Sequence, residues 1–226
     1  MTAEEMRRRE VLRILEQTYK GVGSALKSGD PFQLLVAVML SAQTNDNQVN
    51  KITSSLFLRF PDAAAFAALD PKELMPYISS CGLYKIKAKN IVATARIICE
   101  QYGGKTPQDK DKLTALPGVG GKTANVVLSQ GFGIPALAVD THVFRVSRRL
   151  GLACGKTPVT VEQELCALIP RAKWSEAHHW LIWQGRRVCQ AQKPRCGECP
   201  LCALCPQDAS SQRVECEEKR EKDAFL

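Results

Sequence analysis

The sequence has no long uninterrupted run of apolar residues, although 45% of its 226 residues are hydrophobic. A helix that crosses a membrane needs roughly 18 or more consecutive apolar residues, so we expect no membrane span and no membrane partner. The N-terminus also lacks the apolar stretch of a signal peptide. Its mixed charge is typical of an amphipathic helix, which favours a soluble, cytoplasmic protein without a targeting segment.

Convincing strand-like alternation is also missing, and the chain contains no internal repeat. Apolar residues instead recur at helical spacing, as along residues 91–98. The pairs Asp30-Pro31 and Asp70-Pro71 are typical of a helix N-cap followed by proline in the first turn. Asp140 is placed to cap the apolar helical pattern that follows it. The sequence therefore predicts an almost entirely helical protein with short Gly/Pro loops.

Acidic residues are the minority, with 23 Asp and Glu against 31 Lys and Arg, for a net charge of +8. Residues 207–226 are net acidic at −2, so residues 1–206 carry +10. A compact basic body favours an anionic polymer as partner, most often nucleic acid. The polar segment 207–226 is predicted to be a flexible tail.

The segment from Leu116 to Val127 lacks the glycines of a nucleotide-binding loop. A phosphate-binding nucleotide loop requires glycine where Leu116 stands, and a dinucleotide fingerprint requires glycine where Thr123 stands. The pattern instead predicts two helices joined by a tight Pro-Gly-Val-Gly hairpin. We expect Gly118 and Gly120 to permit positive φ and to bring bare backbone close to a ligand.

Free N–H groups at the start of the second helix of such a hairpin can bind a DNA phosphate without reading sequence. From the residues alone, Lys122 could be one more phosphate contact or a chemically active amine. Both interpretations remain open at this point.

Ten cysteines are many for an intracellular chain, and five of them fall within the 17 residues from 189 to 205. Intracellular disulfides are rare, so metal ligation is the leading interpretation. Three ligands crowd together and the fourth precedes them by seven positions, which favours an iron–sulfur cluster over the paired knuckles of structural zinc. The expected ligands are Cys189, Cys196, Cys199 and Cys205.

Cys202 allows a second spacing, with Cys196, Cys199, Cys202 and Cys205 each separated by two residues, but we interpret Cys202 as a bystander. Lys193 and Arg195 lie in the loop between the first two expected ligands. Ligation would fix these basic residues as a phosphate clamp, whereas the alternative is a solvated pair of charges.

These segments, in chain order, resemble the endonuclease III family of DNA glycosylases. The matching segments are Leu40-Ser-Ala-Gln-Thr44, Gly82-Leu-Tyr84 with Lys87-Ala88, Leu116 to Val127, Val139-Asp-Thr-His-Val-Phe-Arg145, His178-His-Trp180 and the four-cysteine pattern. The resemblance implies an all-α fold of two helical domains with the DNA cleft between them. Residues 23–134 would form a helical-barrel domain with a helix-hairpin-helix motif, and residues 1–22 with 135–206 would form the iron–sulfur domain.

The resemblance also implies a role for each matching residue. Lys122 would be the nucleophile and Asp140 the catalytic carboxylate. Gln43 and Leu83 would enter the duplex where the damaged base is flipped out, and the four cysteines would hold a [4Fe–4S] cluster. Attack by Lys122 requires a neutral amine, and we expect burial and the nearby helix N-terminus to disfavour the cation.

The implied activity is that of a bifunctional DNA glycosylase and AP lyase of the prokaryotic type. It would act as a monomer at the nucleoid, on double-stranded DNA containing damaged bases or abasic sites. Oxidised pyrimidines would be excised through a lysine Schiff base, and the strand nicked by β-elimination. The alternatives are a monofunctional adenine-mismatch glycosylase, a non-catalytic DNA-binding iron–sulfur module and a zinc-binding structural protein.

Overall fold

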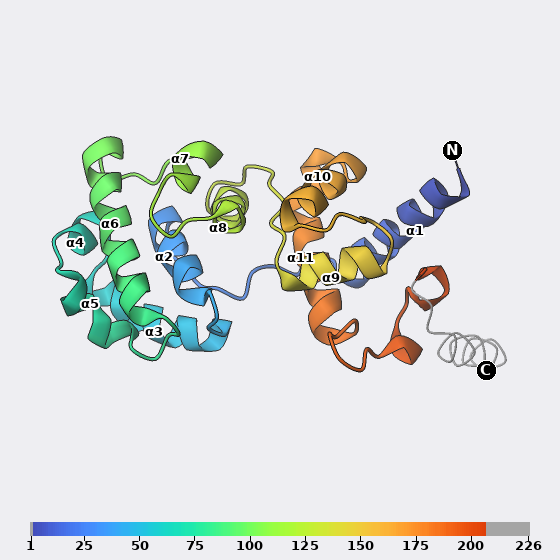
Figure 1. Ribbon diagram of the computed structural model, residues 1–226, viewed down its shortest axis with the longest axis horizontal. Helices are drawn as coiled ribbons and strands as arrows, with labels where there is room; N and C mark the ends of the chain where they lie inside the picture. The colour runs from blue at the N-terminus through green and yellow to red at the C-terminus, as the bar shows by residue number, and fades with distance from the viewer. Residues whose placement is uncertain (1, 207–226) are drawn as a thin grey trace. The chain divides into compact units, whose positions relative to one another are not determined.

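The computed structural model describes residues 2–206. Over this range the chain is helical and contains no strand, which confirms the predicted all-α class. Each helix there is too short or too polar to span a lipid bilayer. The expected tail, residues 207–226, lies outside the described residues. The chain divides into two compact units, shown in Figure 1: unit 2 is Ser24–Ala136, and unit 1 combines Met1–Gly23 with the chain from Leu137 onward.

Unit 2 is built from seven α-helices and one π-helical turn. They are α2 (Pro31–Ser41), α3 (Asp46–Arg59), α4 (Ala63–Ala67), α5 (Pro71–Ile78), α6 (Tyr84–Tyr102), α7 (Lys110–Thr114), α8 (Gly121–Val126) and η1 (Val127–Gly131). Helix α6 packs against α4 and α5, and α2 contacts α3, α6 and α8. Eight of the eleven residues of α2 are buried, namely Phe32 and every residue from Leu34 to Leu40, so this short helix forms the centre of the unit.

Helix caps in unit 2 follow the sequence pattern. Asp30 Oδ1 accepts hydrogen bonds from the Phe32 and Gln33 backbone N–H groups at 2.7 and 3.0 Å. Asp70 forms a complete capping box with Glu73. Such caps satisfy N–H groups that the helix itself leaves unpaired, typically worth about 1 kcal/mol each. Both predicted helix starts are confirmed.

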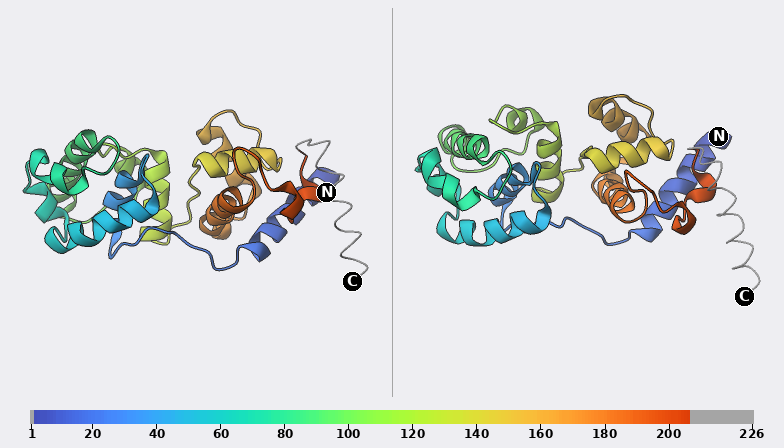
Figure 2. Two further views of the ribbon diagram at one scale, coloured as in Figure 1. Left: turned by 90° about the horizontal axis from the view of Figure 1, so that it is seen from below. Right: turned by 60° about the horizontal axis from the view of Figure 1, so that its bottom comes forward.

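Unit 1 contains the N-terminal helix together with the last third of the described chain. Its elements are α1 (Ala3–Thr18), α9 (Thr141–Arg149), α10 (Pro158–Leu168), η2 (Arg171–Lys173), α11 (Trp174–Arg187) and the 3₁₀ turns η3 (Cys196–Glu198) and η4 (Cys202–Leu204). Helix α11 packs against α1 and α9. Figure 2 gives two further views of the helices, and each unit has its own apolar core.

Candidate functional site

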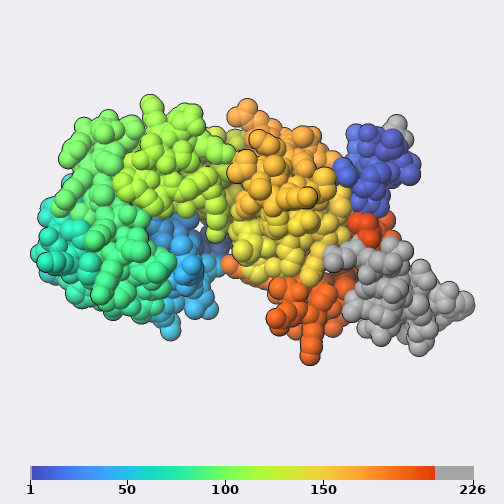
Figure 3. Space-filling view, viewed as in Figure 1, coloured from blue at the N-terminus to red at the C-terminus, as the bar shows by residue number. Residues whose placement is uncertain are grey.

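The glycine-rich segment forms the predicted hairpin between α7 and α8. Gly118 has φ +76°, and a Cβ placed there would lie 2.7 Å from Asn90 Nδ2 and 3.0 Å from Asn90 Cβ. Thr94, also on α6, donates a hydrogen bond to the Pro117 carbonyl at 3.0 Å. Helix α6 therefore supports the hairpin at close range, and only glycine fits at position 118 without strain. Figure 3 shows the α7–α8 region, coloured green to lime, at the surface of unit 2.

Gly120 differs from the expectation. It is the N-cap of α8 with φ −91° and ψ 174°, so the predicted positive φ is wrong at this position. An N-cap residue adopts extended backbone, which any residue can do. Apart from the adjacent residues and the backbone of α8 itself, no atom lies within 4 Å of a Cβ built on Gly120 or Gly121. The backbone here is bare and open, as an approaching phosphate would require, and no side chain caps the helix.

Lys122 is the second residue of α8, directly behind the uncapped helix start. Its side chain is exposed, so the expected burial is not present in the protein without DNA. Five residues beyond it, at Val127, α8 continues into the π-helical turn η1, where the Leu128 carbonyl accepts hydrogen bonds from the backbone N–H groups of Phe132 and Ile134. Such turns are rare and occur often near functional sites. The sequence pattern gave no signal for this one.

Asp140 caps α9, as the sequence predicted. Its Oδ1 accepts the backbone N–H of His142 at 2.9 Å and of Val143 at 2.8 Å. Both bonds use the same oxygen, which holds the half-buried carboxylate in one orientation and leaves Oδ2 outside the cap. The helix start thus orients a carboxylate without consuming its second oxygen.

Behind Asp140, α9 approaches α11 closely at Gly185. A Cβ there would lie 3.0 Å from His142 Cβ and 3.1 Å from Arg145 Nη2. Arg145 donates to the carbonyls of Gly185 and Cys189 at 3.1 and 3.0 Å. Burial lowers the pKa of His142, whereas the Asp140 carboxylate opposes that effect. The helix that carries Asp140 is therefore anchored to the start of the cysteine segment.

Gln43 and Leu83 lie in two turns of unit 2, and both have left-handed backbone, with φ 57° and 58°. Gln43 lies in the α2–α3 turn, and Leu83 immediately precedes α6. Leu83 is 56% exposed, unusual for a leucine in a unit with a well-filled core. Left-handed backbone in a residue other than glycine is strained and occurs preferentially at functional sites. The structure brings these two expected DNA-contacting residues close together.

The four expected ligand cysteines belong to the part of unit 1 that follows α11. Gln184, fully buried, donates from Nε2 to Cys199 Sγ at 3.3 Å and accepts a hydrogen bond from Tyr19 at 2.7 Å. Arg149 donates to Cys189 Sγ at 3.6 Å, and its carbonyl accepts from Cys205 Sγ at 3.3 Å. Each of these three sulfurs therefore has a polar partner supplied by the fold.

The thiols also influence one another. Burial raises the pKa of Cys196, and the neighbouring Cys189 and Cys205 raise it further. Burial likewise raises the pKa of Cys199, opposed by hydrogen bonds from the Leu201 backbone and Gln184. Within residues 2–206 no three His, Cys, Asp or Glu side chains are arranged to hold a single metal ion. Four neighbouring cysteines, two of which accept N–H hydrogen bonds at sulfur, are a ligand set that fits the chemistry of an iron–sulfur cluster.

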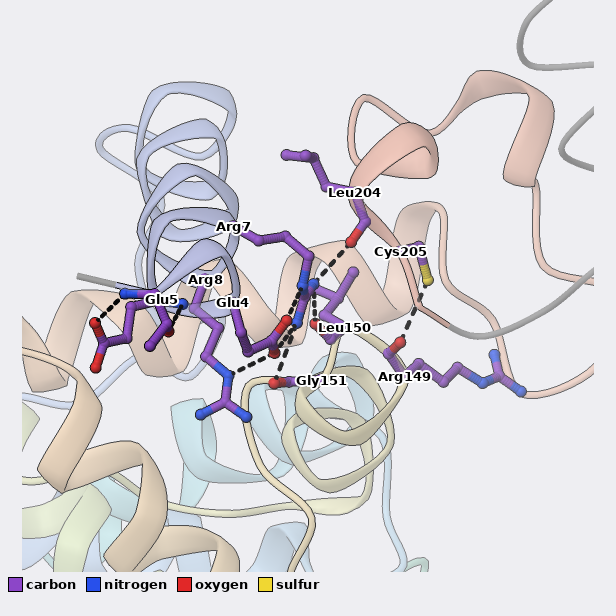
Figure 4. A network of polar contacts seen from close by, with 10 residues as sticks. Glu4, Glu5, Arg7, Arg8, Arg149, Leu150, Gly151, Leu204 and Cys205 are labelled. Atoms are coloured by element: carbon purple, nitrogen blue, oxygen red, sulfur yellow. Dashed lines mark hydrogen bonds and ion pairs between the residues drawn. The ribbon is translucent and has the colours of Figure 1, made fainter.

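Arg7 connects α1 to this cysteine segment. Its guanidinium donates to the Leu150 carbonyl at 2.9 Å and the Leu204 carbonyl at 2.7 Å, and it pairs with Glu4 (Figure 4). A cavity of about 630 Å³ lies alongside, lined by Glu4, Arg8, Phe144, Arg145, Arg148, Arg149, Gly151, Ala153, Cys154 and Pro206. Arginine outnumbers acid in this lining, so the cavity is a basic region of unit 1.

Lys193 and Arg195 are exposed in the loop that links Cys189 to Cys196. The Arg195 backbone N–H closes the loop by donating to the Val188 carbonyl at 3.0 Å. Arg149 holds its other side through the carbonyls of Gln190 and Ala191, at 2.6 and 3.1 Å. Arg195 also lies 3.9 Å from Glu198, a weak surface pair that leaves its charge accessible.

Comparison with known proteins places this architecture in a class. Residues 36–171 match the HhH-GPD superfamily of base excision DNA repair proteins. Endonuclease III of Synechocystis sp. is 47% identical over 93% of this chain and 97% of its own length. Endonuclease III of Bacillus subtilis is 51% identical over 80% of this chain and 83% of its own. A solved structure of a trapped endonuclease III–DNA covalent intermediate has a TM-score of 0.87 and 41% identity, covering 97% of this chain and all of that one.

The fold, the hairpin and these similarities define a helix-hairpin-helix DNA repair enzyme. The chain belongs to the endonuclease III family. It is a DNA glycosylase and AP lyase of base excision repair, as the motifs predicted. Proteins of this family generally carry a [4Fe–4S] cluster, and the cysteine segment of this chain is suited to one.

Proposed function

We propose that this protein excises oxidised pyrimidines from double-stranded DNA, with Lys122 as nucleophile and Asp140 as its carboxylate partner. The observation that carries this proposal is the position of Lys122. It is an exposed amine beside an uncapped, open helix start that can accept a phosphate. The similar solved structure of a trapped endonuclease III–DNA covalent intermediate supports covalent chemistry with DNA.

Base removal begins with extrusion of the damaged nucleotide, because a stacked base cannot be reached. We assign Leu83 to wedge into the stack and Gln43 to hydrogen-bond the orphaned base, since both protrude from adjacent strained turns. Gly118 and Gly120 present hairpin backbone to a phosphate. Lys193 and Arg195 would contact the DNA backbone from the cysteine loop.

Lys122 then attacks the sugar C1′ with its amine lone pair, and the C1′–N bond breaks as the base leaves with the electron pair. Opening of the sugar ring leaves an imine between Lys122 and C1′. Removal of a C2′ proton then expels the 3′ phosphate by β-elimination. Water finally hydrolyses the imine and frees the lysine. Because Lys122 is exposed, the DNA itself must cover and desolvate the amine.

Asp140 is suited to stabilise positive charge that develops on the sugar and to assist proton transfer. Its cap bonds keep the carboxylate oriented, and Oδ2 remains for this role. Lys122 belongs to unit 2 and Asp140 to unit 1. Cys189, Cys196, Cys199 and Cys205 would hold the [4Fe–4S] cluster, which would close their loop. We further propose that the protein acts as a monomer, at the nucleoid of a bacterial cell.

Borohydride trapping on duplex DNA containing thymine glycol tests this function. Borohydride reduces the imine and should lock the protein onto the DNA, whereas Lys122→Gln should form no adduct and lose at least about 1,000-fold in activity. DNA affinity should change only a few-fold, because one phosphate contact among many is lost. If Lys122→Gln still forms the adduct, Lys122 is not the nucleophile. Base excision by the unaltered protein without nicking would indicate a monofunctional enzyme.

A further inference from the structure

Lys87 is a buried lysine in the middle of unit 2. It lies on the first turns of α6 and is only 7% exposed. Its ammonium donates to the Leu40 carbonyl at 2.8 Å, the Ala42 carbonyl at 2.6 Å and Thr44 Oγ1 at 3.3 Å. Among the described residues none of its hydrogen-bond partners is a carboxylate. The charge is therefore compensated by neutral oxygen atoms alone.

These three acceptors surround a single residue, Gln43. Ala42 and Thr44 are its direct neighbours, and Gln43 itself has left-handed backbone with φ 57°. A residue other than glycine keeps this conformation only where the surroundings impose it. The ammonium of Lys87 binds the turn on both sides of Gln43, so it supplies that constraint.

Lys87 is also coupled to the second strained residue, Leu83. The Lys87 backbone N–H donates to the Leu83 carbonyl at 3.0 Å and completes the first turn of α6. Leu83 has φ 58°, and no side chain caps the helix that it opens. One residue is thus attached to both turns, by its backbone to the Leu83 turn and by its side chain to the Gln43 turn.

The two turns touch each other as well. A Cβ added to Gly82 would lie 3.5 Å from the Gln43 carbonyl oxygen and 3.9 Å from Gln43 Cβ. Nearby, Gln48 Nε2 donates to Ser80 Oγ at 2.8 Å and links α3 to the segment that follows α5. The turns that carry Gln43 and Leu83 are therefore in contact, and both residues are exposed.

The hydrogen bonds to the Gln43 turn offset the cost of burying this ammonium. Burial lowers the pKa of Lys87, which means that its charged form is disfavoured by this environment. A hydrophobic side chain of similar length would avoid that penalty, but it would leave the Leu40 and Ala42 carbonyls without their donor. The ammonium is therefore matched to the turn that it binds.

We propose that Lys87 is a positioning residue that holds Gln43 and Leu83 together as one preassembled wedge for base extrusion. The inference rests on the proposed function, because it assumes that these two side chains enter the duplex. A preassembled wedge enters the base stack without first ordering two strained turns, so Lys87 acts on extrusion and not on the chemical step.

Lys87→Met and the matched control Lys89→Met test this role. Lys89 is an exposed lysine on the same helix, so its replacement removes the same charge without touching the turns. Single-turnover excision of thymine glycol would be measured in a paired duplex and in an unpaired bubble. Lys87→Met should slow excision about ten-fold in the duplex and less than about two-fold in the bubble. Lys89→Met should change the two rates by the same factor.

A fluorescent base analogue opposite the lesion would report extrusion directly, and its signal should fall with Lys87→Met. An equal loss of rate on paired and unpaired lesions would overturn the proposal, since it would indicate a general structural role. An unchanged duplex excision rate in Lys87→Met would also overturn the proposal. Should Lys87→Met fail to fold, Thr44→Val removes a single acceptor and should still slow the duplex reaction selectively, by about two- to three-fold. A non-selective Thr44→Val effect would overturn the proposal.

Leu83→Ala distinguishes a failure of the proposed Lys87 role from a failure of the proposed wedge on which that role rests. If Leu83→Ala leaves duplex excision unchanged, the wedge itself is wrong. If Leu83→Ala slows duplex excision but Lys87→Met does not, only the role of Lys87 is wrong. The double variant should be no slower than the slower single variant, because Lys87 acts through Leu83 and Gln43. If the rate losses of the two single variants multiply in the double variant, Lys87 acts elsewhere.

Discussion

Unit 2 holds its proposed DNA-contacting residues on strained backbone above an apolar core, whereas unit 1 holds Asp140 and the cysteines through polar contacts. In unit 2, Gln43, Leu83 and Gly118 all have positive φ. In unit 1, Gln184 and Arg149 instead connect sulfur atoms to the helices. A strained turn depends on the packing beneath it, while a thiol segment depends on what the thiols bind. The two units should therefore fail under different perturbations.

Loss of the cluster should produce the largest difference between the units. Cys199→Ser removes a proposed ligand whose side chain packs against the unit 1 core and accepts a hydrogen bond from Gln184. We expect loss of brown colour and loss of hydrogen-exchange protection in unit 1, while unit 2 keeps its protection. Exchange measured by mass spectrometry separates the units, because peptides from 24–136 belong to unit 2 alone.

Cys202→Ser is the matched control for this cluster prediction. Cys202 begins η4 and lies in the same segment, yet we interpret it as a bystander. The variant should keep its colour and its activity. A correctly folded but colourless Cys202→Ser protein would assign the ligand role to Cys202. Equal loss of protection in both units after Cys199→Ser would show that they do not unfold separately.

The hairpin of unit 2 should respond next most strongly. Gly118→Ala combines left-handed strain with a contact of 2.7 Å to Asn90, so we expect a loss of about 1–3 kcal/mol in unfolding free energy. Gly120→Ala meets no atom and has φ −91°, so its stability should change by less than about 0.5 kcal/mol. Urea unfolding measures both.

DNA affinity should reveal an effect of Gly120→Ala that its stability does not. A methyl group on Gly120 would stand where we place the phosphate, so Gly120→Ala should weaken DNA binding although the fold is intact. If Gly120→Ala binds DNA normally, the open backbone is not a phosphate contact. If Gly118→Ala is as stable as the unaltered protein, the approach of α6 to the hairpin is looser than the structure shows.

Local signals predicted much of the fold. The caps at Asp30, Asp70 and Asp140 were predicted because capping depends on residues three positions apart. The strain at Gln43 and Leu83 and the burial of Lys87 depend on turns brought together from distant segments. No pattern along the chain encodes those contacts. For the same reason the expected burial of Lys122 and the positive φ at Gly120 were wrong.

Acidification should produce the smallest difference between the units. All three histidines, His142, His178 and His179, belong to unit 1. Burial lowers the pKa of His142 and of His179 below the ordinary value. The unfolded chain then binds more protons than the folded one, so stability is full above about pH 6.5 and declines as pH falls toward the folded values.

The three tryptophans, Trp174, Trp180 and Trp183, also lie in unit 1, so their fluorescence follows that unit specifically. The urea concentration at the unfolding midpoint of unit 1 should decrease as the pH is lowered from about 7 to about 5. Labelling of Cys81, which is 2% exposed in unit 2, should change less over the same range. His179→Gln removes one partly buried titrating group and should flatten the tryptophan-detected profile. A profile as steep as that of the unaltered protein would mean that other groups of unit 1, such as its carboxylates, control the acid response.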